Sequence, residues 1–134
     1  MNSLHIVRFT VAYWCVFAMV LMPIACAFLA KRGSFQGKDN HDPRGWAAKQ
    51  GDWRARALAA QANTFESLPF FIGAVIVAHQ LGAGQTLLDL LALAFVMLRG
   101  FYVLMYVSDM PTVRSAVWLA GFAVNTAIFF LGYR

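Results

Sequence analysis

The sequence predicts an all-α fold, an integral membrane bundle of four helices. Of its 134 residues, 60% are hydrophobic and only 13% are charged, whereas a soluble domain of this size needs a far more charged surface. Apolar runs of about 20 residues, the length that crosses a hydrocarbon core about 30 Å thick, recur along the chain. Charged residues gather instead in one polar stretch, so the bilayer is the expected solvent.

The first apolar run has no charged residue from Phe9 to Ala30, which makes it too long for the apolar region of a cleaved signal peptide. Lys31 and Arg32 follow as a stop-transfer flank, so we expect a retained span. Short connections between the later runs predict antiparallel neighbours. The predicted single domain, 1–134, has spans at about 10–29, 54–81, 86–107 and 112–131 and a polar loop at 31–53.

Basic residues predict the orientation of these spans. Arg114, between the third and fourth spans, falls on the same side as the polar loop, whereas Arg8 and Arg134 fall on the opposite side. The positive-inside rule therefore places the loop in the cytoplasm and both termini outside. Topology also explains the net charge of +5, and no nucleic acid partner is expected. The basic residues of the loop and its flanks are Lys31, Arg32, Lys38, Arg44, Lys49, Arg54 and Arg56.

Cysteines and histidines give no sign of a disulfide or a metal site. Cys15 and Cys26 lie in one apolar run, 11 residues apart, which on a helix is about 16 Å and beyond disulfide reach. No metal-ligand spacing is present. The histidines, His5, His41 and His79, all fall away from the expected cavity described next, so no metal is predicted.

Polar residues inside the predicted spans mark a candidate site. Arg56, Asn63 and Glu66 follow spacings of seven and three, which puts them on one helix face. Glu66 lies ten residues past Arg56, about 15 Å into the membrane. Arg99 lies ten residues past Asp89 at the outer end of the third span, so antiparallel helices bring Glu66 and Arg99 to similar depth.

The same face of the third span continues from Arg99 to the tyrosines, and Arg114 follows at the cytoplasmic mouth. A Glu–Arg pair alone could simply fix helix register. The larger set on matching faces favours one cavity open to the cytoplasm, because ionisable groups within a membrane are costly. The expected lining is Asn63, Glu66, Arg99, Tyr102, Tyr106 and Arg114. Deeper in the fourth span, Asn125 is expected to hydrogen-bond between helices.

These residue types suit a small zwitterionic or peptide-like anion. Guanidinium groups bind carboxylates in bidentate fashion. A carboxylate and an asparagine amide can bind an ammonium group or peptide amides. An arginine at the mouth can also stabilise a thiolate by Coulomb attraction.

The segment Asn63-Thr-Phe-Glu66-Ser-Leu-Pro69 matches the N-x-x-E-x-x-P signature of the membrane-associated proteins in eicosanoid and glutathione metabolism, the MAPEG family. The chain resembles this family over nearly its whole length. Asp42-Pro43-Arg44 in the loop resembles bacterial members in particular. The third-helix pattern and the arginine of the fourth helix correspond to Arg99, Tyr102, Tyr106 and Arg114.

The resemblance implies a homotrimer of four-helix protomers in a bacterial inner membrane. It implies glutathione as cosubstrate, bound between neighbouring protomers near the cytoplasmic face, with Arg114 as the catalytic residue that activates the thiol. Lipophilic electrophiles or lipid hydroperoxides would arrive from the bilayer, making the protein a transferase or peroxidase. The residues that the resemblance assigns to glutathione are Arg56, Gln61, Asn63, Glu66, Arg99, Tyr102 and Tyr106.

Two other functions stay open from the sequence. A non-catalytic lipid-binding or scaffolding protein of the same fold is favoured by Ala59, where the eicosanoid enzymes often have an arginine, and by Ser67. A small transporter or channel subunit is the third, with Glu66 and Arg99 lining a pathway. Many transporters are built from internal repeats, and this sequence contains none.

Overall fold

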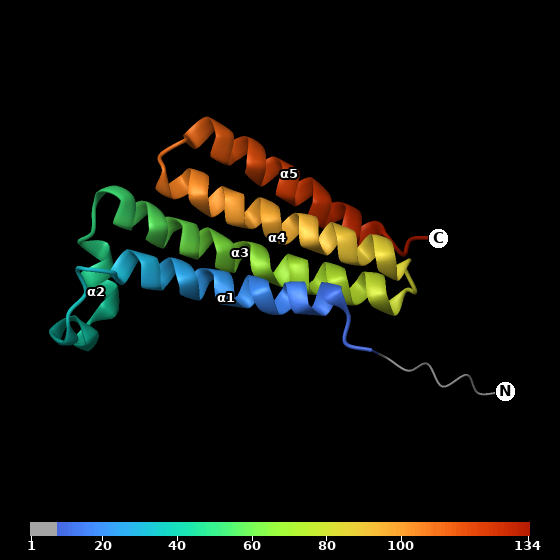
Figure 1. Ribbon diagram of the computed structural model, residues 1–134, viewed down its shortest axis with the longest axis horizontal. Coiled ribbons are helices and arrows are strands. Elements are labelled where there is room, and N and C mark those ends of the chain that lie inside the picture. Colours follow the sequence, from blue (N-terminus) through green and yellow to red (C-terminus); the bar gives the residue numbers. More distant parts are fainter. Residues whose placement is uncertain (1–7) are drawn as a thin grey trace.

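The computed structural model describes residues 8–134, which form long helices packed side by side (Figure 1). The all-helical prediction is confirmed, since these residues form no strand. The prediction for His5, and part of that for the N-terminus, fall on residues 1–7, outside the described part. The elements are α1 (Val11–Lys31), the 3-10 helix η1 (Gly37–His41), α2 (Pro43–Ala48), α3 (Asp52–Gln80), α4 (Gln85–Val107) and α5 (Pro111–Phe130).

Helix α1 begins with two caps that satisfy free backbone amides of its first turn. The Thr10 side chain accepts a hydrogen bond from the Tyr13 amide at 3.2 Å. Asp89, from α4, accepts another from the Ala12 amide at 2.9 Å. Because the first amides of a helix have no partner within it, the Asp89 contact both caps α1 and ties it to α4.

The stretch predicted as a loop, 31–53, is partly helical, and α3 begins at Asp52 rather than at residue 54. The reason is local capping. The Asp42 carboxylate accepts from the Gly45 amide at 2.9 Å, and Pro43 occupies the first turn of α2, where its missing amide costs nothing. Trp46 is buried and its ring meets that of Phe35 at 5.1 Å, which anchors the short helix.

Three helices of the described region, α1, α4 and α5, are long and apolar enough to cross a membrane. Helix α3 is the longest, at 29 residues, but it contains Arg54, Arg56 and Glu66. Large apolar side chains such as Phe28 and Met97 are more than 70% exposed on the outside of the bundle, which suits a lipid environment. The start of α1 and the C-terminus lie at the end opposite α2 (Figure 1).

The core lies between α1, α3, α4 and α5. Phe71 and Phe95 stack there with ring centroids 4.4 Å apart, and both are buried. Ala74 and Ala78 on α3 are also fully buried, since small residues let helices approach closely. Helix α5 packs against α4 and α3. This arrangement brings the polar residues of three helices onto one side of the core.

We expect the Asp89→Ala substitution to destabilise the protein by about 1–2 kcal/mol, because it removes the cap on α1. It also removes the acceptor of the Gln85 side-chain amide, which donates to the Asp89 carboxylate at 2.7 Å. Thermal unfolding in detergent measures the change. Asp89→Asn, which keeps an acceptor oxygen, should recover most of the stability. Equal losses in the two variants would contradict a capping role.

Candidate functional site

The polar face of α3 is organised by hydrogen bonds one turn apart. The Asn63 amide nitrogen donates to the Glu66 carboxylate at 3.4 Å. The Thr64 hydroxyl is fully buried and donates to the Ala60 carbonyl at 2.7 Å. Because this bond satisfies the hydroxyl hydrogen, the Thr64 oxygen stays available as an acceptor for a neighbouring helix.

Arg99 on α4 uses both acceptors. Its Nη2 donates to Asn63 Oδ1 at 3.0 Å and to Thr64 Oγ1 at 3.1 Å, and the residue is only 3% exposed. Glu66 and Arg99, which helix geometry predicts at similar depth, line one cavity. The hydrogen bonds join them through Asn63, because the Glu66 side chain is exposed on the outside of α3 whereas Arg99 is buried beneath it.

Arginine and tyrosine side chains alternate toward the α4–α5 turn. The Arg99 guanidinium lies 4.2 Å from the centroid of Tyr102, and that of Arg114 lies 4.3 Å from the centroid of Tyr106. The two tyrosine rings meet edge to face at 5.7 Å. Cations within about 6 Å of a ring centroid are attracted to its face, so these four residues form one ordered row.

The expected single cavity is divided into two neighbouring chambers that share Asn63 and Trp118. The outer chamber is an open space of about 440 Å³ lined by Asn63, Tyr102, Tyr106, Arg114, Ser115, Trp118 and Leu119. The inner chamber has a volume of about 200 Å³ and is lined by Asn63, Glu66, Ser67, Phe70, Phe95, Arg99, Trp118, Gly121, Phe122 and Asn125. Each predicted lining residue therefore lines at least one of the two chambers.

Two residues that the resemblance assigns to glutathione lie elsewhere. The Arg56 Nε donates to the Val107 carbonyl at 3.1 Å, in the last turn of α4, where carbonyls have no partner within the helix. Gln61 is half-buried and lines neither chamber. These two side chains line neither chamber of this chain.

Sequence reasoning missed the aromatic half of the inner chamber. Phe70, Phe95, Trp118 and Phe122 were not singled out as lining residues, because such residues recur throughout an apolar span. The expected hydrogen bond between helices for Asn125 is also not observed. Its Oδ1 has no hydrogen-bond partner among residues 8–134. The single amide side chain in an otherwise apolar part of the span was the one sequence feature that could have indicated Asn125 as a chamber residue.

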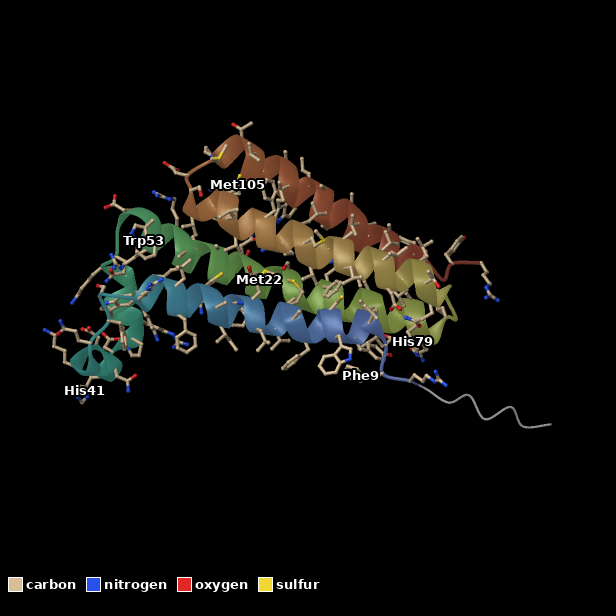
Figure 2. All side chains as sticks on the ribbon, in the orientation of Figure 1. Phe9, Met22, His41, Trp53, His79 and Met105 are labelled. Atoms are coloured by element: carbon tan, nitrogen blue, oxygen red, sulfur yellow. The ribbon has the colours of Figure 1, made fainter. Side chains whose placement is uncertain are left out.

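The histidines among residues 8–134 lie outside both chambers. Figure 2 shows His41 at the α2 end of the molecule and His79 at the other end, with the bundle between them. Within residues 8–134, no group of three or more histidine, cysteine or acidic side chains is placed to hold a metal ion. The chambers therefore offer guanidinium, phenol, amide and carboxylate groups.

The sequence model of the MAPEG family matches residues 11–133 of this chain. The match spans all four long helices and both chambers. Neither a curated protein nor a solved structure matches the chain significantly. Together with the three apolar helices, the family match identifies an integral membrane protein.

Proposed function

Because this chain belongs to the MAPEG family, we propose that it is a membrane-bound glutathione-dependent transferase or peroxidase acting on lipophilic electrophiles or lipid hydroperoxides. The observation that supports this most is the outer chamber. It gathers Arg114, Tyr106, Tyr102 and Asn63, four residues that the family resemblance assigns to the thiol peptide, from three different helices.

The proposal includes α3 as a fourth membrane span. Its 29 residues can extend about 43 Å, which covers the bilayer core with turns to spare for Arg54 and Arg56 near the headgroups. By the positive-inside rule, the α2 end would lie in the cytoplasm and both termini outside, in a bacterial inner membrane.

A homotrimer is part of the same proposal. Arg56 and Gln61 lie outside the chambers of their own protomer, where a neighbouring subunit's glutathione can contact them. The terminal nitrogens of Arg56 stay available for this, since only its Nε is used by Val107. In a closed trimer every protomer both gives and receives such contacts.

The residues of the outer chamber suit the chemistry of a thiolate. The Arg114 guanidinium, held over the Tyr106 ring, supplies a fixed positive charge that favours the thiolate over the thiol. Asn63, which lines both chambers, and Glu66 and Arg99, which line the neighbouring end of the inner one, supply an amide, a carboxylate and a cation for the polar ends of the tripeptide. The thiolate sulfur then attacks the electrophile and displaces a leaving group. For a hydroperoxide, it attacks one oxygen and breaks the O–O bond, giving an alkoxide and a sulfenic acid, which a second glutathione converts to the disulfide and water.

We expect glutathione to raise the thermal stability of the detergent-solubilised protein. A ligand at 100 times its dissociation constant adds about 2.7 kcal/mol to the free energy of unfolding. Thermal unfolding at increasing glutathione measures the effect, and an equimolar mixture of free glutamate, cysteine and glycine is the control. No shift at millimolar glutathione would count against the proposal.

A non-catalytic lipid-binding protein is the second candidate. A groove of about 490 Å³ at the N-terminal end of α1 favours it, because its lining is almost wholly apolar. The lining residues are Phe9, Tyr13, Val16, Phe17, Val20, Ile72 and Ile76. Lipid that remains bound after purification and is unaffected by excess glutathione would support this function over the first.

A further inference from the structure

Asn125 places a polar group where the membrane interior offers it no partner. The residue lies on α5, is 2% exposed and lines the inner chamber. Its Oδ1 is buried and receives no hydrogen bond from residues 8–134. Buried polar groups in proteins are almost always hydrogen-bonded, and no bulk water reaches the bilayer core. The wall of this chamber therefore holds an acceptor that lacks a donor.

The walls around Asn125 are aromatic. The Trp118 and Phe122 rings are parallel to within 4°, with centroids 5.5 Å apart, and the Phe70 ring lies 5.9 Å from that of Phe122. Gly121 adds no side chain to the wall formed by α5, and a Cβ there would lie 3.8 Å from Phe95. The chamber of about 200 Å³ exceeds the roughly 150 Å³ of an engineered protein cavity that accepts benzene.

The other polar groups of the chamber lie at its opposite end. Gly121 faces Phe95 across the antiparallel pair α4 and α5. Arg99 lies four residues past Phe95 and Asn125 four past Gly121, in opposite directions, so the two are roughly 12 Å apart along the helices. A buried water molecule needs two to four polar partners, and beside Asn125 it would find one.

We propose that the inner chamber binds a small aromatic molecule with a hydroxyl group, a phenol in chemical class. The ring lies among the aromatic walls, and the hydroxyl donates to Oδ1 once the Asn125 amide turns toward the ligand. A hydroxyl is the smallest group that supplies the missing donor, and an aromatic ring matches walls that are themselves flat rings. The proposal goes beyond thiol chemistry, because it depends on the aromatic end of the inner chamber around Asn125, away from Glu66 and Arg99, and not on whether glutathione binds.

The test compares 4-fluorophenol with fluorobenzene, which lacks only the hydroxyl. Fluorine NMR titrations in nanodiscs give a saturable affinity of each compound for the wild type and for Asn125→Leu. Partition into lipid is the same for both proteins and cancels in the comparison. We expect the affinity for 4-fluorophenol to fall about 3- to 10-fold in Asn125→Leu, and that for fluorobenzene to stay the same or rise.

A second pair of variants tests the chamber without changing Asn125. Gly121→Ala adds a methyl group to the wall, and we expect weaker binding of both compounds. Gly100→Ala is the matched control, because a Cβ at Gly100 on α4 meets no atom within 4 Å. Weaker binding in Gly121→Ala than in Gly100→Ala supports the site even if Asn125→Leu does not fold.

Any one of the following results would overturn the proposal. The first is the absence of saturable binding of either compound, which would leave the chamber to water or lipid. The second is an unchanged affinity for 4-fluorophenol in folded Asn125→Leu, or equal effects of Gly121→Ala and Gly100→Ala. The third is tighter binding of n-hexanol than of 4-fluorophenol, which would indicate an acyl chain as the occupant.

Discussion

The Arg114→Ala substitution is expected to lower kcat for glutathione conjugation of a generic aryl halide by about 10²–10³-fold. This is the range seen when one group that stabilises developing or fixed charge is removed from an active site. Arg114 lies over Tyr106 at the open side of the outer chamber, so its loss should leave the packing of the helices intact. Initial rates at saturating glutathione measure the change.

The pattern of kinetic constants distinguishes this role from simple binding. Arg114→Lys keeps the charge but loses the planar guanidinium, and should retain part of the rate. Arg44→Ala, at an exposed residue of α2, is the matched control for the loss of one positive charge and should have wild-type rates. A rise in KM with unchanged kcat in Arg114→Ala would mean that the residue only binds the peptide.

We expect Arg99→Met to abolish the stabilisation by glutathione while the ligand-free protein is unchanged or up to about 2 kcal/mol more stable. Removing a cation from water and lipid headgroups costs several kcal/mol, and its hydrogen bonds recover only part of this. Arg99 is 3% exposed, its Nε has no partner among residues 8–134, and both its acceptors are neutral. Methionine fills a similar length without the charge.

Thr64→Val is the control for this prediction. It leaves the guanidinium in place but removes one of its acceptors, and we expect a loss of about 1–3 kcal/mol, the opposite direction from Arg99→Met. Thermal unfolding with and without glutathione measures both variants. A loss of several kcal/mol in ligand-free Arg99→Met would instead mean that Arg99 is a structural group.

Much of the fold follows from the sequence because the bilayer imposes a simple length rule. Long apolar runs predict the helices. A short break such as the Ser-Asp-Met-Pro run at 108–111 marks where one helix ends and the next begins. The helical content of the 31–53 stretch was missed because it depends on single caps. The Asp42 carboxylate and the position of Pro43 determine where α2 begins, and a reading of the stretch by its polar composition does not detect such single residues.

The polar face of the site was also predictable from spacing. Helical periodicity places Asn63 with Glu66 and Arg99 with Tyr102, and the structure has both pairs in contact. Periodicity does not state which partner a long side chain selects across helices. Only the packed structure shows that Arg99 donates to Asn63 and Thr64. Only the packed structure also shows that the cavity is divided into an inner and an outer chamber.

We propose that Arg114 holds glutathione as a thiolate within the membrane. The ultraviolet difference spectrum of the protein with saturating glutathione, recorded from acid to alkaline pH, tests this role most directly. We predict a thiolate band whose pH midpoint lies below that of free glutathione in the wild type and returns toward the free value in Arg114→Ala. A thiolate band that appears only at the pH of free glutathione, and equally in both proteins, would contradict the claim.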